Sequence, residues 1–427
     1  MHTCVPSLDH ARSEASARRV RVGSAHVNRS PSPRRAVSSR FAFVGVAYAF
    51  GVTMLGTTLP TPLYPAYERQ LGFADLMTTV IYAAYAVGVL VALVLLGRAS
   101  DAVGRRPMLI AGVLASIASA LVFVTDAGLT VLFVGRVLSG LSAGIFTGTA
   151  TVALVELGGS THGGRSSLFA SAVNMFGLGC GPLLAGLLAQ WAPAPLRLPY
   201  AVDLALLVVA LLIVWFMPET VESTGSRWLR PQGPSVPRQA RAAFIPVAIA
   251  AFAAFSVFGL LTAIEPVFMG TLLHRSSPAL AGAVVFSMFA GSAIGQVGLR
   301  ISGPAALPAG CVVLVAGLAG VAAGLLVDSL VALVIGTVVV GIGQGISFRA
   351  GIAAVTAASP AHRRAETVST FFMVAYVAIS IPVILVGLAA RSWGLRTAGV
   401  TFTAAVAALA LLALAAVLRL NRRNLTA

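Results

Sequence analysis

Long apolar runs separated by short polar segments dominate the chain. Each run is long enough for an α-helix to cross a hydrocarbon core of roughly 30 Å. Six runs precede a polar stretch from Pro218 to Arg241, and six follow it. The pattern predicts twelve transmembrane helices, at residues 41–64, 77–97, 107–125, 128–151, 166–189, 198–217, 243–269, 279–299, 304–325, 329–355, 366–390 and 395–418.

The polar stretches divide the chain into segments. We predict a disordered Arg-rich cytosolic tail at 1–40, a six-helix bundle at 41–217, a cytosolic linker at 218–241, a second six-helix bundle at 242–418 and a cytosolic tail at 419–427. A mitochondrial transit peptide would share the Arg and Ser content of the first segment, but Pro31 and Pro33 disfavour an amphipathic helix there. A start codon placed too early is a further alternative.

An internal repeat relates the two halves at an offset near 200 residues. In the fourth and tenth predicted helices, the coinciding positions are Gly135 with Gly336, Gly140 with Gly341 and Gly144 with Gly345. In the helices that follow them, Pro182 coincides with Pro382 and Gly186 with Gly387 to within a residue. Transporters built from duplicated halves show this pattern. Chance is the alternative in a chain with 43 glycines, because small residues also serve ordinary helix packing.

Composition and charge exclude several classes of protein. The chain is 58% hydrophobic and 10% charged, against roughly 25% charged residues in ordinary soluble domains. Its net charge of +16 comes from 29 arginines that lie between the apolar runs, which disfavours a nucleic-acid-binding face. With both termini in the cytoplasm, cytosolic segments hold 22 of these arginines and external loops five, as the positive-inside rule requires. The three cysteines lack metal-ligand spacing, so we expect no metal site and no redox chemistry.

The loop between the second and third predicted helices carries the first motif, G-R-A-S-D-A-V-G-R-R, with Gly97, Asp101, Gly104, Arg105 and Arg106. The glycines permit a tight turn, the aspartate can pair with an arginine or cap a helix, and the arginines face the cytosol. The segment resembles the hallmark loop of the major facilitator superfamily, G-x-x-x-D-x-x-G-R-R, although Ala102 replaces a basic residue. A merely topogenic loop would explain the arginines alone.

The fourth predicted helix contains Arg136 in an uncharged run, followed by Gly140 and Gly144. An arginine at the centre of a membrane helix costs about 2.5–3.5 kcal/mol, so it usually faces water, a ligand or a counter-charge. The segment is similar to a motif of the same superfamily whose arginine is associated with proton coupling or substrate. The alternative is an arginine that snorkels to the outer interface.

The fifth predicted helix contains Gly177, Gly181, Pro182 and Gly186. These residues resemble the antiporter motif of drug:proton exchangers in the superfamily, G-x-x-x-G-P-x-x-G-G, with Ala185 in place of one glycine. The proline removes a backbone hydrogen bond and the glycines let a neighbouring helix approach closely. The motif favours export, whereas a Gly-Pro kink by itself is common in membrane helices.

Three polar residues of the second half are candidates for the cavity or for proton coupling: Glu265, Gln344 and Arg349. A carboxyl group in a cavity can take up and release a proton as the cavity alternates between the two sides. Solvated positions near the helix ends are the alternative for Glu265 and Arg349.

Other polar groups within the apolar runs are expected at the membrane interface. Asp203 lies close to Arg197 at the start of the sixth helix. Four tyrosines would line a cavity or, as is commoner, anchor the interface; they are Tyr48, Tyr64, Tyr82 and Tyr85.

The resemblance implies an all-α membrane protein with the major facilitator fold, twelve helices in two pseudo-symmetric bundles, acting as a monomer in a bacterial plasma membrane. It implies alternating access, in which an inward proton drives a small hydrophobic or cationic compound outward. We expect a transporter and not an enzyme, with no cofactor, because nucleotide-binding and nucleophile motifs are absent from the sequence. Its partners are then a small-molecule substrate, protons and the lipid bilayer.

Two other functions stay open. A polar metabolite such as a sugar would need several hydrogen-bonding groups, and Asn174, Gln296 and Gln344 are few for that task. A receptor or scaffold without transport would need no charge inside the membrane, so Arg136 and Arg349 count against it.

Overall fold

The chain folds into long, roughly parallel helices in the computed structural model, which describes residues 33–97, 99–126, 128–159, 163–220, 233–299, 301 and 303–426. Within these residues, twelve helices are long and apolar enough to cross a membrane. They are α1 (Pro33–Thr58), α3 (Asp75–Leu96), α5 (Arg105–Thr125), α6 (Leu129–Leu157), α7 (Gly163–Trp191), α8 (Leu198–Phe216), α9 (Arg241–Thr271), α10 (Pro278–Ala293), α11 (Ala306–Leu326), α12 (Leu330–Ala358), α13 (Arg364–Trp393) and α14 (Leu395–Thr426). Two short helices, α2 (Tyr64–Leu71) and α4 (Ala99–Val103), lie in connections. The all-helical fold class predicted from the sequence is therefore confirmed.

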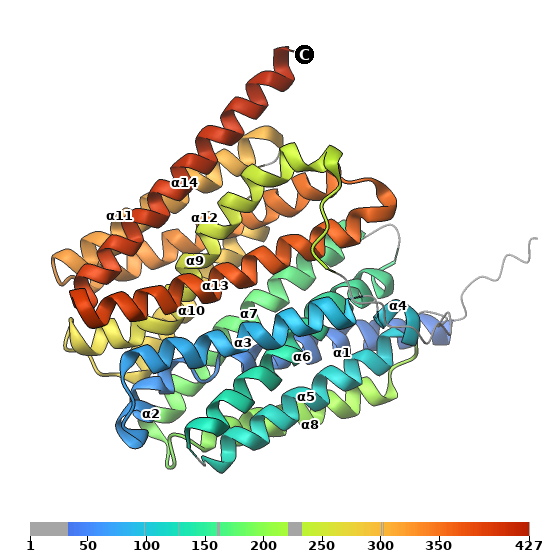
Figure 1. Ribbon diagram of the computed structural model, residues 1–427. Coiled ribbons are helices and arrows are strands. Elements are labelled where there is room, and N and C mark those ends of the chain that lie inside the picture. Colours follow the sequence, from blue (N-terminus) through green and yellow to red (C-terminus); the bar gives the residue numbers. More distant parts are fainter. Residues whose placement is uncertain are drawn as a thin grey trace, which may run out of the picture. The chain divides into compact units, whose positions relative to one another are not determined.

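The two halves repeat the same packing. In the first half α6 packs against α3 and α5, and α5 packs against α8; in the second half α12 packs against α10 and α11, and α11 packs against α14. Figure 1 shows the first half in blue and green and the second in yellow and red. This correspondence confirms two pseudo-symmetric six-helix bundles.

The glycines of the internal repeat lie where helix backbones touch. Gly140 on α6 lies against the carbonyl of Tyr85 on α3, and Gly341 on α12 lies against the carbonyl of Met288 on α10. Only a residue without a side chain allows two helix backbones this close. The coincidence of glycines in the sequence therefore reflects two copies of the same helix crossing.

The halves meet through α7 against α10 and through α3 against α13. We call the bundle end near Tyr64 the Tyr64 end, and the end formed by residues 97, 99–106, 217–220, 233–241 and 359–364 the Arg105 end. At the Tyr64 end, Gly186 of α7 lies against the backbone of Pro278 on α10. The Gln190 side-chain carbonyl there accepts hydrogen bonds from the Ser277 hydroxyl at 2.5 Å and from the Ala279 N–H at 3.2 Å. The halves are thus packed together at the Tyr64 end.

The first predicted helix has different ends in the structure. Helix α1 begins at Pro33, within the segment predicted as a tail, because proline is tolerated in the first turn of a helix. It stops at Thr58, and a 3₁₀ turn at Thr61–Leu63 leads into α2, which continues to Leu71. The prolines after Thr58 lack the N–H groups that a continued helix would use. Residues 1–32 of the predicted tail lie outside the described residues.

The last predicted helix is longer than expected, because α14 runs to Thr426 and takes in the segment predicted as a carboxyl-terminal tail. The Asn421 side-chain amide donates a hydrogen bond to the Pro304 carbonyl at 2.9 Å, which ties this end to the start of α11. Residues 221–232 of the predicted linker lie outside the described residues.

Gly140→Ala should destabilise the protein, because a methyl group there overlaps the Tyr85 carbonyl oxygen. We expect a loss of about 1–3 kcal/mol in the free energy of unfolding. Gly148→Ala, on the same helix α6, is the matched control, since nothing lies within 4 Å of its added methyl group. Thermal unfolding in detergent should give a lower midpoint for the first variant and an unchanged or higher one for the control; equal midpoints would contradict the close crossing of α3 and α6.

Candidate functional site

Arg136 lies at the centre of the site, on α6, with 1% of its surface exposed. Its guanidinium carbon lies 5.3 Å from the ring centre of Tyr82, 5.4 Å from that of Tyr85 and 5.9 Å from that of Tyr64. Three aromatic faces around one cation give favourable cation–π contacts. The side chain is enclosed within the protein, so the alternative of a snorkelling arginine is wrong.

The end of α1 supplies the hydrogen-bond acceptor for Arg136. The Arg136 Nη1 donates a hydrogen bond to the Thr57 carbonyl oxygen at 2.6 Å. Thr57 belongs to the last turn of α1, where carbonyl groups have no partner within the helix and carry partial negative charge. Arg136 therefore caps the interrupted helix, and carbonyl dipoles and ring faces balance its charge.

A central cavity of about 80 Å³ lies beside Arg136 and is lined from both halves. Its polar lining consists of Thr57, Thr58, Thr147, Asn174, Thr262 and Gln344 in addition to the guanidinium. Its aromatic lining consists of Tyr82, Tyr85, Phe255, Phe258, Phe289, Phe348, Phe372 and Tyr376. A pocket of flat rings with few polar groups suits a small amphipathic molecule.

A larger entrance cavity of about 730 Å³ lies between the halves and shares Thr147, Asn174, Phe348 and Phe372 with the central cavity. Its charged lining residues are Arg165 and Arg349. At the Tyr64 end a separate cavity of about 350 Å³ lies between the halves, and it shares no lining residue with the central cavity. The central and entrance cavities therefore form one path that reaches the centre from between the halves, and the contacts at the Tyr64 end separate this path from that side. Neither cavity has an aspartate or glutamate among its described lining residues.

Tyrosines close the centre between the halves. Tyr376 on α13 lies beside Tyr85 on α3, with ring centres 6.2 Å apart and planes at 59°. Both line the central cavity, as do Tyr82 on α3 and Thr262 on α9. Tyr82 and Tyr85 thus line the cavity and do not anchor the membrane interface.

The other two candidate tyrosines are placed differently. Tyr64 is 1% exposed and lies beside Arg136, but it lines neither cavity. Tyr48 donates a hydrogen bond to the Leu206 carbonyl at 3.2 Å and belongs to neither cavity.

Glu265 on α9 is fully buried and lies outside both cavities, so the solvated alternative is wrong. Its Oε1 accepts a hydrogen bond from the Thr337 hydroxyl at 3.1 Å, and its Oε2 has no partner among the described residues. Thr337 follows Arg136 by the same 201 residues that separate Gly140 from Gly341. The contact between Glu265 and Thr337 therefore repeats, in the second half, the contact between α1 and Arg136 in the first.

Asp203 on α8 is 2% exposed and lies against Gly56 of α1, so the expectation of an interfacial aspartate was wrong. Its Oδ1 has no partner among the described residues. The sequence placed it near a helix end, but α1 covers it because Gly56 has no side chain. Asp203 and Glu265 are two buried carboxyl groups that make no ion pair with Arg136 in the described structure.

Gln344 and Arg349 lie on successive turns of α12 but do different things. The Gln344 side-chain carbonyl accepts a hydrogen bond from the Ser292 hydroxyl at 2.6 Å at the edge of the central cavity. Arg349 is partly exposed, and its Nη1 donates to the carbonyls of Gln296 at 3.0 Å and Leu299 at 3.3 Å. It holds the π-helical turn at Ile294–Gly298 that ends α10, with its charge at the entrance cavity.

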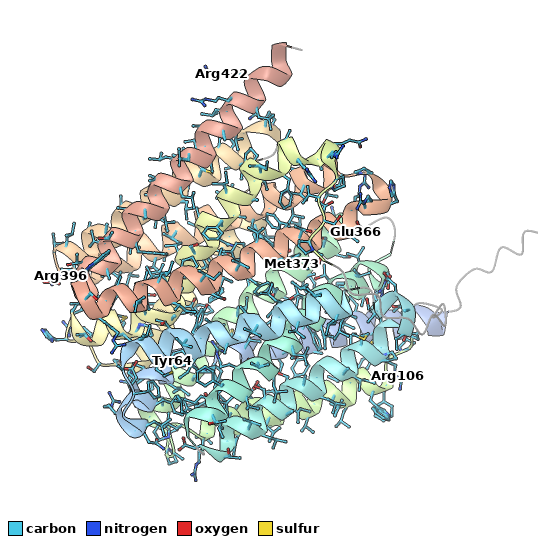
Figure 2. All side chains as sticks on the ribbon, in the orientation of Figure 1. Tyr64, Arg106, Glu366, Met373, Arg396 and Arg422 are labelled. Carbon is cyan, nitrogen blue, oxygen red and sulfur yellow. The ribbon has the colours of Figure 1, made fainter. Side chains whose placement is uncertain are left out.

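The loop motif forms a charge cluster within the first half. Arg105 pairs with Asp101 at 2.5 Å and with Glu156 on α6 at 3.1 Å, and its side chain is only 7% exposed. Glu219, after α8, accepts hydrogen bonds from the backbone N–H groups of Arg105 at 2.8 Å and Arg106 at 3.0 Å, which caps α5. In Figure 2, Arg106 lies at the Arg105 end and Tyr64 lies toward the other.

Gly97 and Gly104 bracket the short helix α4 in this motif. Gly104 has φ +111° and lies against the Glu219 carboxylate, so both its conformation and its lack of a side chain are required there. Gly97 closes α3 in an ordinary helical conformation.

Sequence reasoning missed Glu156 and Glu219, which complete this cluster. Each is an acid just beyond or at the end of an apolar run, on the same side of the predicted membrane as the basic loop. Their position on the same side of the membrane as Arg105 indicated that they could pair with it. The sequence alone, however, does not show which helix ends are neighbours.

The motif of the fifth helix is a packing surface. Gly177 and Gly181 lie against the backbone of α1, and Gly144 of the fourth-helix motif similarly lies against α3. Pro182 and Gly186 lie against α10 of the other half. The motif therefore joins the first helix to the interface between the halves, and of its segment Leu178 lines the central cavity while the four motif residues do not.

Comparison with known proteins gives a consistent picture. Residues 42–327, about two thirds of the chain, match the family model of the Major Facilitator Superfamily. Quinolone resistance protein NorA of Staphylococcus aureus is 24% identical over 181 residues, which are 42% of this chain and 46% of that protein. Multidrug resistance protein 2 of Bacillus subtilis is 25% identical over 171 residues, 40% of this chain and 42% of that protein. The matches span less than half the length of these relatives.

Solved structures support the fold. The human organic anion transporter MFSD10 (TETRAN) aligns with a TM-score of 0.64 at 18% identity, covering 89% of this chain and 99% of that one. A crystal structure of a peptide transporter, POT, aligns with a TM-score of 0.70 at 16% identity, covering 91% of this chain and 95% of that one. At these identities the likeness shows the fold alone.

Arg105→Ala should destabilise the protein more than Arg396→Ala. Both arginines pair with an aspartate at 2.5 Å, but the Arg105 side chain is 7% exposed and the Arg396 side chain 44%. Loss of the buried, multiply bonded arginine should cost about 1–3 kcal/mol, and loss of the exposed pair at most about 1 kcal/mol. Thermal unfolding in one detergent buffer measures the difference, and equal shifts would show that the loop cluster contributes no more than a surface ion pair.

Proposed function

Because this chain belongs to the major facilitator superfamily, we propose that it is a secondary active transporter that exports small amphipathic aromatic compounds by alternating access. The observation that carries the proposal is the aromatic central cavity beside Arg136, which is joined to an entrance cavity between the halves, whereas the cavity at the Tyr64 end is separate from it. One open path and one closed end are what a transporter has in one of its two states.

The lining of the cavity favours an aromatic solute over a sugar. Eight of its lining side chains are aromatic, and its amide groups are those of Asn174 and Gln344. A sugar would need many more donors and acceptors. Of the hydrophobic and cationic compounds that the sequence suggested, the hydrophobic ones suit this lining, since no described carboxylate faces the cavity. The relatives named for quinolone resistance and multidrug resistance support export.

The distribution of arginine supports the direction. With the Arg105 end in the cytosol, both termini and the linker are cytoplasmic, as the positive-inside rule favours. The packed Tyr64 end then faces outward, and the entrance cavity admits solute from the cytosol. We place the protein in a bacterial plasma membrane and expect it to act as a monomer, because one chain encloses the whole cavity.

Glu265 is our candidate for proton coupling. It is a fully buried carboxyl group, one oxygen of which has no partner in the part of the chain that the structure describes, and it lies next to Pro266 within α9. Loss or gain of a proton there changes the charge buried between α9 and α12, and so biases how these helices pack. Asp203 is a second buried carboxyl group with the same property in the first half.

Glu265→Gln should abolish uphill transport while leaving downhill exchange. In proteoliposomes with an imposed pH gradient, a fluorescent quinolone should be moved by the wild type with a matching proton flux, read by a pH dye. The glutamine cannot ionise, so the variant should show less than about a tenth of the gradient-driven rate and retain counterflow of labelled quinolone.

Asp328→Asn is the control, since Asp328 is a half-exposed residue that pairs with Arg396 far from the cavity. It should transport like the wild type. Gradient-driven transport that survives Glu265→Gln would remove Glu265 from coupling; the absence of quinolone movement with every variant, together with uptake of a sugar, would favour the polar-metabolite alternative.

A further inference from the structure

We propose that the central cavity binds compounds with a negatively charged group, a carboxylate or sulfonate carried on an aromatic ring, and that Arg136 is the residue that binds this group. The inference rests on the proposed function and specifies its substrate class. It departs from the hydrophobic or cationic compounds suggested by the sequence.

The first observation is the charge along the path. Arg136 lines the central cavity, and Arg165 and Arg349 line the entrance cavity. The described lining of both cavities contains no aspartate or glutamate, so the path is positively charged throughout. A groove of one sign with apolar walls concentrates solutes of the opposite sign.

The buried acids do not offset this charge. Glu265 accepts a hydrogen bond from Thr337, Asp203 lies against Gly56 of α1, and neither lines either cavity. Described ion pairs involve residues near the two bundle ends. A cationic solute would therefore meet Arg136 without a carboxylate to compensate it, in a poorly hydrated place where like charges repel strongly.

The second observation is that Arg136 is incompletely bonded. A guanidinium has five N–H donors in a fixed fork. Nη1 is bonded to the Thr57 carbonyl, whereas Nε is buried without a partner among the described residues. A buried donor without an acceptor is unfavourable, and a carboxylate or sulfonate accepts two N–H bonds from such a fork.

The third observation is the arrangement of rings around the cation. Tyr82 and Tyr85 face both the guanidinium and the cavity, and Phe258 and Phe289 form an edge-to-face pair with ring centres 5.5 Å apart across from them in the second half. An acid attached directly to an aromatic ring can reach Arg136 while its ring, which is larger than the central cavity of about 80 Å³, extends past Phe348 and Phe372 into the entrance cavity. The Arg349 guanidinium is held by two backbone carbonyls at the entrance, where it can attract the same anion.

The test uses three probes of equal ring size and different charge: 1-naphthoate, 1-naphthylmethanol and 1-naphthylmethylammonium. Binding of each to the purified full chain is measured by equilibrium dialysis, and exchange of each by counterflow in proteoliposomes. We expect the naphthoate to bind about 10- to 100-fold more tightly than the ammonium compound, the range for a hydrogen bond to a charged group. Equal binding, or tighter binding of the ammonium compound, would overturn the inference.

Arg136→Gln tests the residue, with Arg396→Gln as the matched control at an exposed arginine outside both cavities. The first variant should bind the naphthoate no better than the alcohol, and the control should keep the wild-type preference. Arg136→Lys keeps the charge without the fork and should retain a reduced preference for the anion. A preference that is unchanged in Arg136→Gln would exclude Arg136 as the anion site.

The outcomes separate this inference from the proposed function. Exchange of the ammonium compound or the alcohol without exchange of the naphthoate would overturn the inference and leave the transporter proposal standing. If the wild type binds and moves none of the probes and no quinolone, both fail. The wild-type comparison is decisive even if Arg136→Gln does not fold.

Discussion

The enclosure of one arginine inside a membrane-spanning bundle is the constraint on which the centre of this structure depends. A guanidinium in this position needs compensation, and the chain provides it without a carboxylate. The compensation consists of the broken end of α1, which offers the Thr57 carbonyl, and the faces of three tyrosines. The break in α1, the tyrosines of α2 and α3 and the arginine of α6 therefore act together, and they leave the Arg136 Nε without a partner among the described residues, on a side chain that lines the cavity.

Close contact between helix backbones governs how the rest of the bundle is assembled. Glycines let α6 approach α3, α7 approach α1 and α10, and α12 approach α10. Contacts of this kind rely on shape and not on charge, so they can separate and re-form without leaving buried ions unpaired. The tight contact of Gly186 with Pro278 at the Tyr64 end is of this type, as the proposed alternating access would require of an end that opens in the other state.

Charge is used differently at the Arg105 end. There the cluster of Arg105, Asp101, Glu156 and Glu219 lies entirely within the first half and ties the ends of α5, α6 and α8 together. It ties one bundle together as a body, so under the proposed alternating access the motion between the halves would be concentrated at the interface of α7 with α10 and of α3 with α13. A rigid half that rocks against its partner is the motion alternating access requires.

The sequence by itself determined the twelve helices, the two-fold repeat and the three motifs. The length of each apolar run is set by the thickness of the bilayer, and glycine spacing is a local property of the sequence. It could not determine how deeply the polar side chains within these helices are buried in the protein. Whether Arg136, Asp203 and Glu265 were solvated or buried depended on which helices cover them, and proximity to a helix end gave the wrong answer for Asp203. The partners of Arg105 and the tyrosines around Arg136 come from helices far apart in the chain, so only tertiary packing brought them together. Tertiary packing therefore also decided which charged residues line the path to the centre.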